Sequence, residues 1–142
     1  MNSCYFGSQP DMGPRPYVIN VPQKARQNTN FRSTLWTGCN AQMTLMCIMP
    51  GSDIGLENHT DTDQFVRVEQ GMGLVKMGAC EDRPEFQARV VTGDTIFVPA
   101  GTFHNIINIG KIPLKLSSVY APPHHPAGTV HHTKKDSEKE SY

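Results

Sequence analysis

Four side chains that can bind a metal ion stand in two short stretches of the sequence. Glu57, His59 and Gln64 fall within eight residues, and His104 follows in a second stretch. A carboxylate, an amide oxygen and two imidazoles form a donor set that suits a divalent ion of the Mn, Fe, Co, Ni or Zn group. The residue types therefore indicate metal chemistry at these four positions.

The residues around these side chains have the composition of strands joined by turns. Glu57 and His59 are two positions apart, so on an extended strand both side chains leave from the same face. Residues 60–63 are polar and turn-like, and a β-type run resumes with Gln64 at its start. Residues 93–108 contain a β-branched run, a Pro-x-Gly turn and a further apolar strand. We therefore expect strands rather than flexible loops to carry the four side chains.

Short strands separated by glycine and proline account for most of the remaining chain. We expect them at residues 31–37, 42–49, 71–78, 87–92 and 113–120, with a charged loop at 79–86. Such short, regular spacing favours an all-β barrel or sandwich. Ahead of these strands, residues 17–21 alternate apolar and polar side chains and predict a short edge strand. Residues 23–30 predict a single helical turn or a loop.

The two ends of the chain differ from its middle. Residues 1–30 predict an N-terminal arm, irregular up to residue 16, that lies along a barrel of its own chain or of a neighbour. Residues 122–142 predict a polar tail in which three prolines prevent regular pairing, and its last ten residues are polar enough to be disordered. The tail carries four histidines that we interpret as solvated side chains rather than metal ligands: His124, His125, His131 and His132.

The two stretches with the candidate ligands resemble the two motifs of the cupin superfamily, in particular the mannose-6-phosphate isomerase-like proteins of the cupin-2 type. Ten residues fall on the motif spacing: Gly51, Glu57, His59, Gln64 and Gly71, then Gly93, Pro99, Gly101, His104 and Asn108. The resemblance implies a double-stranded β-helix, the jelly-roll barrel of cupins, over residues 31–121. It also implies one divalent transition metal ion per chain in the barrel mouth, bound by Glu57, His59, Gln64 and His104.

This chain departs from the cupin motif at two of the implied ligands. Glu57 stands where the family usually has its first histidine, and Gln64 stands where it usually has glutamate, so the total charge of the ligands is unchanged. Asp61 and Asp63 are alternative ligands in place of Glu57, since a small adjustment of the turn could bring either carboxylate to the ion. Residues that alternate with the ligands are expected to line the mouth: Val66, Val68, Ile106, Asn108, Ser118 and Tyr120.

Composition excludes several classes of function and location. Thirteen basic and thirteen acidic residues leave no net charge, so a nucleic-acid partner is not expected. The longest apolar run, residues 43–49, is too short to span a membrane, and the N-terminus lacks the features of a secretory signal. The four cysteines at positions 4, 39, 47 and 80 form no CxxC motif and are expected to be reduced. The cytoplasm is the expected compartment.

A metalloenzyme acting on a small polar molecule is the first functional hypothesis. Sugar isomerases or epimerases and dioxygenases are the subclasses that the cupin resemblance implies. The alternative is a cupin that binds a small molecule without turnover, or a structural barrel. Small barrels of this kind pair through exposed strands, so we expect a homodimer with residues 17–21 or 31–37 near the contact.

Overall fold

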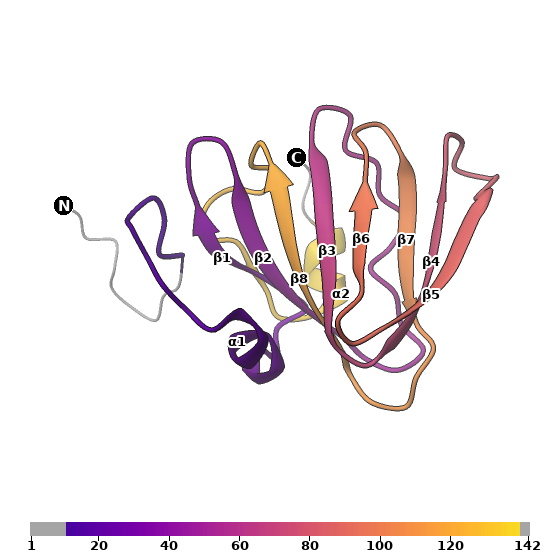
Figure 1. The fold of residues 1–142 in the computed structure, drawn as a ribbon, viewed down its shortest axis with the longest axis horizontal. Coiled ribbons are helices and arrows are strands. Elements are labelled where there is room, and N and C mark those ends of the chain that lie inside the picture. The colour runs from indigo at the N-terminus through magenta and orange to yellow at the C-terminus, as the bar shows by residue number, and fades with distance from the viewer. Residues whose placement is uncertain (1–10, 140–142) are drawn as a thin grey trace.

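The computed structural model describes residues 11–139 and confirms the all-β double-stranded β-helix (Figure 1). The nine strands are β1 (Arg32–Thr37), β2 (Gln42–Ile48), β3 (Asp63–Gln70), β4 (Met72–Gly78), β5 (Phe86–Val91), β6 (Thr95–Val98), β7 (Phe103–Asn108), β8 (Leu114–Ala121) and β9 (Val130–His131). Helix α1 (Val21–Gln27) precedes them, and helix α2 (Lys134–Glu138) follows them. The strands predicted at 31–37, 42–49, 71–78, 87–92 and 113–120 are all present within one residue of their expected bounds.

Two antiparallel sheets face each other across the barrel. The larger sheet has the order β6-β3-β8-β2-β1-β9, and the smaller has the order β5-β4-β7. Single bridges from Asp53 to Ile107 and from Glu57 to His104 lay the segment 53–57 along the free side of β7. The smaller sheet is therefore widened on that side by a segment that is not a regular strand.

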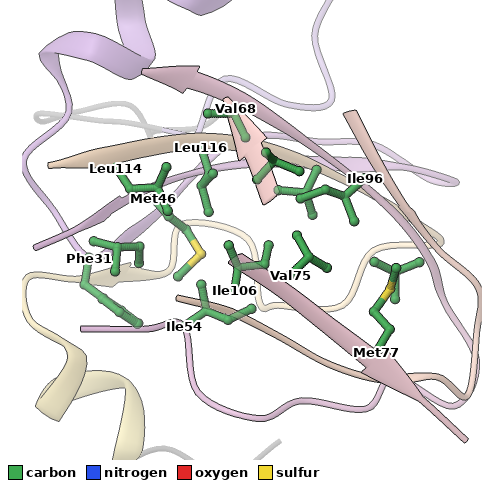
Figure 2. Packing of buried hydrophobic residues seen from close by; sticks show 14 residues of the cluster. Phe31, Met46, Ile54, Val68, Val75, Met77, Ile96, Ile106, Leu114 and Leu116 are labelled. Carbon is green, nitrogen blue, oxygen red and sulfur yellow. The ribbon is translucent and has the colours of Figure 1, made fainter. Parts of the chain in front are cut away.

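The core fills the space between the sheets, as the period-two alternation of the strands requires. On β3, for example, Val66 and Val68 are buried, whereas Phe65 and Arg67 are exposed. Figure 2 shows side chains of the larger sheet, among them Val68 and Leu116, opposite Val75 and Ile106 of the smaller one. The buried apolar side chains of this cluster include three residues that we had expected to line the barrel mouth: Val66, Val68 and Ile106.

The expected edge strand at residues 17–21 is wrong. Asn20 instead caps α1, because its side-chain oxygen accepts a hydrogen bond from the backbone N–H of Gln23 at 2.9 Å. Pro22 in the first turn favours the helix as well, since its missing N–H needs no partner there. Of the helical turn and the loop that were the two alternatives for residues 23–30, the structure has the helix, which begins at Val21. Ala25 packs with Leu35 and Leu45 on the outer face of the larger sheet.

Residues 122–138, which we call the C-terminal strap, are more ordered than their composition predicts. β9 pairs with β1, so that Arg32 lies opposite His131. Thr133 and Asp136 form a reciprocal capping box that begins α2. The expectation of a tail without regular pairing and with a disordered end is wrong for these residues. His125 and His131 are buried rather than solvated.

Three of the four cysteines lie within the described residues, and all three are free thiols: Cys39, Cys47 and Cys80. Cys4 and the start of the N-terminal arm fall outside the described range. No helix within residues 11–139 combines the length and apolar character needed to cross a membrane.

Candidate metal centre

Three of the four predicted ligands meet at one end of the barrel. Glu57, His59 and His104 each present one ligand atom, and these atoms lie within 4.8 Å of one another. Oε1 of Glu57 is 3.2 Å from Nε2 of His59 and 3.7 Å from Nε2 of His104. Both histidines are buried, and the carboxylate is partly exposed. Three residues that the sequence predicted as ligands of one metal ion therefore lie together in the structure.

Backbone hydrogen bonds fix the relative positions of these residues. Glu57 and His104 exchange two backbone hydrogen bonds of 2.9 Å, which place them directly opposite each other. The carbonyl of His59 accepts a hydrogen bond of 2.8 Å from the N–H of Gly101. Gly101 has φ +82°, a conformation that glycine adopts without strain in a tight turn. The Pro-x-Gly turn therefore anchors the segment that carries His59.

Glu57 and His59 do not lie on a regular strand, contrary to the prediction. Glu57 forms a single bridge to β7, and residues 58–62 form a loop. Pro50 and two glycines with positive φ, Gly51 and Gly55, interrupt the extended backbone ahead of them. The two side chains reach the centre because the loop is tied to the 99–102 turn, not because they share one face of a strand.

The protonation of His104 suits a metal ligand. Its Nδ1 lies 3.0 Å from the carbonyl oxygen of Thr102, which can only accept, so Nδ1 carries the proton. Nε2 therefore presents a lone pair, and this buried atom has no hydrogen-bond partner among the described residues. It faces the carboxylate of Glu57, so two acceptors oppose each other in a site from which most water is excluded. A cation between them would satisfy both.

Gln64 offers a second unsatisfied atom. Its side chain is buried, and Nε2 donates a hydrogen bond of 3.2 Å to Oγ of Ser118. The carbonyl oxygen Oε1 is also buried but has no partner in the described part of the chain. Gln64 lies opposite Tyr120 in the β3–β8 register, and the ring of Tyr120 contacts His59 at a centroid distance of 5.5 Å. The free amide oxygen thus belongs to the same wall as the histidines.

The alternative carboxylates are placed differently. Asp61 and Asp63 are exposed, and neither belongs to the cluster. Oδ1 of Asp63 accepts a hydrogen bond of 2.9 Å from the backbone N–H of Ala100. Asp63 thus helps to hold the 99–102 turn against the start of β3. Both features favour Glu57 as the carboxylate of the centre.

Arg32 is a site residue that the sequence did not predict. It is 1% exposed, and its guanidinium donates a hydrogen bond of 3.0 Å to Oε2 of Glu57. Burial alone would raise the pKa of Glu57, but the hydrogen bond from His59 and the charge of Arg32 hold that pKa well below its ordinary value. Glu57 is therefore ionised at neutral pH, with Oε2 bound to Arg32 and Oε1 directed at the histidines.

The C-terminal strap holds Arg32 in place. The guanidinium donates a hydrogen bond of 3.0 Å to Oγ of Ser137 and lies 3.5 Å from Nδ1 of His131. Ser137 and His131 come from α2 and β9, which reach the centre only because the strap folds back along β1. No local sequence signal marks Arg32, since its partners are about 100 residues further along the chain.

An aromatic wall closes one approach to the centre. The ring of His124 lies against that of His59 at 4.1 Å and against Tyr120 at 5.7 Å. Burial, and then the charges of His59 and Arg32, lower the pKa of His124 to about 4. Burial and the charge of Glu57 raise the pKa of Tyr120. Tyr120, expected to line the mouth, is fully buried and contacts His59. His124 was expected to be solvated, but it is half-buried against the rings of His59 and Tyr120.

We expect His125, one of the two buried histidines of the strap, to make the stability of the fold sensitive to acid. Burial, then the charges of Arg32 and His124, lower the pKa of His125 from 6.5 to about 2. Below pH 6.5 the unfolded chain therefore binds a proton that the folded chain does not, so stability falls as the pH falls. The loss is about 1.4 kcal/mol per pH unit, or about 2 kcal/mol between pH 6.5 and about pH 5. Urea unfolding of metal-free wild type and His125→Gln at several pH values measures this loss. If the free energy of unfolding fell equally with pH in both proteins, His125 would not be its cause.

Three comparisons relate the chain to known proteins. A family model described as a cupin domain matches residues 44–120. The uncharacterised protein YrkC of Bacillus subtilis is 55% identical over 127 residues, which are 89% of this chain and 68% of YrkC. The crystal structure of BH2720 from Bacillus halodurans superposes with a TM-score of 0.92 and 52% identity over 93% of this chain and 100% of BH2720. A predicted oxalate decarboxylase of Thermotoga maritima shares only the fold, at a TM-score of 0.52 and 22% identity over 60% of this chain and 69% of its own.

Proposed function

We propose that this chain, which belongs to the cupin family, binds one divalent transition metal ion through Glu57, His59, Gln64 and His104. The observation that carries the proposal is the buried lone pair of Nε2 of His104, directed at an ionised carboxylate. The free Oε1 of Gln64 supports it independently. Without a cation these atoms would remain unsatisfied in a largely buried site.

The donor set leaves the ion able to act on a small molecule. Two neutral imidazoles, one carboxylate and one amide do not cancel the charge of a divalent ion, and four ligands leave positions open. When bound, the ion supplies Lewis-acid polarisation of an oxygen-bearing ligand, or activation of water or dioxygen if it is redox-active. We infer a metalloenzyme of the isomerase, epimerase or dioxygenase type.

The residues of the chain have defined roles in this proposal. Arg32 holds Oε2 of Glu57, which leaves Oε1 for the ion. Thr102 fixes the tautomer of His104 so that Nε2 is the ligand atom. Tyr120 and His124 form the wall that excludes water on the side of His59.

We also propose that the protein is a homodimer in the cytoplasm. Exposed apolar side chains outside the barrel core support pairing: Val18 is 97% exposed, and Phe65 and Phe97 form an edge-to-face pair on the outer face of β3 and β6. Burial of such side chains is favourable, and a second copy is the partner that is always present. The free thiols of Cys39, Cys47 and Cys80 suit a reducing compartment.

Native mass spectrometry of untagged protein tests both parts in one measurement. We expect a mass of two chains and about one transition metal ion per chain. The identity of the metal then directs the substrate search, because iron points to oxygen consumption and manganese or zinc to isomerisation. Protein that stays metal-free after incubation with each of the five ions would contradict the metal centre, and a single-chain mass would contradict the dimer. A full metal centre with no turnover of sugar or dioxygenase substrates would favour the non-catalytic alternative.

A further inference from the structure

The two seams between the sheets differ. On one side, the segment 53–57 lies along β7 and inserts Ile54 into the core, while Lys134 of α2 forms an ion pair with Asp53. On the other side, β5 and β6 are consecutive in the chain, yet each is the last strand of its own sheet. The barrel is therefore closed along one seam and open along the other.

A cleft of about 620 Å³ occupies the open seam. Its interior is formed by apolar side chains of the barrel core, among them Val75, Val90 and Ile96. Phe86 of β5 also lines it, and this residue is 54% exposed. We call this feature the seam cleft. Its volume lies within the range of about 300–1,000 Å³ that is common for small-molecule sites.

The seam cleft borders the candidate metal centre. Met77, which lines the cleft, lies opposite His104 in the β4–β7 register. Thr102 lines the cleft and accepts the hydrogen bond from Nδ1 of His104. Gly101 lines it too and donates to the carbonyl of His59. Two residues of the cleft wall, Gly101 and Thr102, therefore also orient the two histidines.

We propose that the seam cleft binds the apolar body of an amphipathic small molecule whose oxygen-bearing head lies at the metal centre. This inference rests on the proposed function and narrows its substrate class. The aromatic wall of His124 and Tyr120 covers the side of His59, whereas the cleft lies against the 99–102 turn, of which Pro99, Gly101 and Thr102 line it. A highly hydroxylated sugar would leave its polar groups unpaired against this lining, so an acyl or alkyl group is the better match.

Calorimetric titration with butanoate, hexanoate and octanoate tests the proposal on the manganese-loaded protein. Each methylene buried in the cleft is expected to tighten binding about fourfold. Ala88 is half-buried and lines the cleft, so Ala88→Phe should remove the dependence on chain length. Gln87→Phe is the matched control, because Gln87 is exposed on the opposite face of β5 and the dependence should persist.

A second variant keeps the proposal testable if Ala88→Phe does not fold. Phe86→Ser removes a ring that lines the cleft and is partly exposed, and it should weaken octanoate binding several-fold without loss of metal. Equal affinities for butanoate and octanoate in metal-loaded wild type would overturn the cleft assignment and leave the metal centre intact. Dependence on chain length in protein that binds no metal would overturn the metal centre and leave the cleft assignment standing. Dissociation of a dimer by Ala88→Phe, with no carboxylate binding in wild type, would assign the cleft to a second copy.

Discussion

His104→Ala is expected to lose the bound metal ion while the barrel remains folded. Nε2 of His104 is a buried lone pair with no protein partner, so its removal deletes a ligand without breaking a protein hydrogen bond at that atom. Loss of a residue that merely supports a ligand weakens metal binding about 10–100-fold, and loss of the ligand itself should exceed this. Elemental analysis should give about one ion per wild-type chain and almost none in the variant.

Thermal unfolding provides an independent reading of the same prediction. A ligand at 100 times its Kd stabilises the folded state by about 2.7 kcal/mol, so added metal should raise the Tm of wild type but not of His104→Ala. Asn105→Ala is the matched control, since Asn105 is the next residue of β7 and its side chain donates to Asp53 instead. Retention of metal by His104→Ala, or equal loss in Asn105→Ala, would contradict the assignment. Gln64→Leu, which removes the free Oε1, is expected to lie between these two variants.

Arg32→Met is expected to destabilise the metal-free protein strongly. Arg32 is the cation bound to the carboxylate of Glu57 and is 1% exposed. Removal of one partner of a buried ion pair costs about 3–5 kcal/mol, because the remaining charge is left in a poorly solvated site. Urea unfolding in the presence of a chelator measures the loss. Arg89→Met is the control, since Arg89 is exposed on β5, and it should cost less than about 0.5 kcal/mol.

Added metal should partly restore the stability of Arg32→Met. A bound cation would compensate the charge of Glu57 that Arg32 no longer compensates, so added metal should stabilise the variant more than wild type. A purely structural arginine would show no such difference. Equal losses in Arg32→Met and Arg89→Met would instead show that Glu57 is well solvated without its partner.

The strands and three residues of the centre could be predicted because their signals are local. Glycine and proline spacing marks the strand ends, and the spacing of the two motifs identifies Glu57, His59 and His104. In the structure, the hydrogen bond from Gly101 to the carbonyl of His59 holds the two motifs together. The edge strand at 17–21 failed because its alternation is short and Asn20 with Pro22 forms a stronger local signal for a helix start. That signal was present in the sequence and could have been recognised.

Arg32 and the C-terminal strap could not be predicted in the same way. The composition of the strap resembles that of a disordered tail, and its order depends on pairing with β1 and on the contacts of Ser137 and His131 with Arg32. Only the Thr133-x-x-Asp136 capping box is visible locally. The seam cleft could not be predicted either. Period-two alternation places Val75, Val90 and Ile96 inside, but it does not show that β5 and β6 do not pair with each other.

The distance along the chain between Arg32 and His131 has a consequence for biosynthesis. The two residues are 99 positions apart, so β1 and its first partner β2 are made long before β9, the strand that pairs with the other edge of β1. At about 5–20 residues per second, the ribosome needs about 5–20 s to bridge that interval. During translation the nascent chain therefore exposes an unpaired edge at β1, and Glu57 has its arginine without the groups that orient it. The proposed metal centre would therefore acquire the complete set of contacts around Arg32 only after the strap has been made.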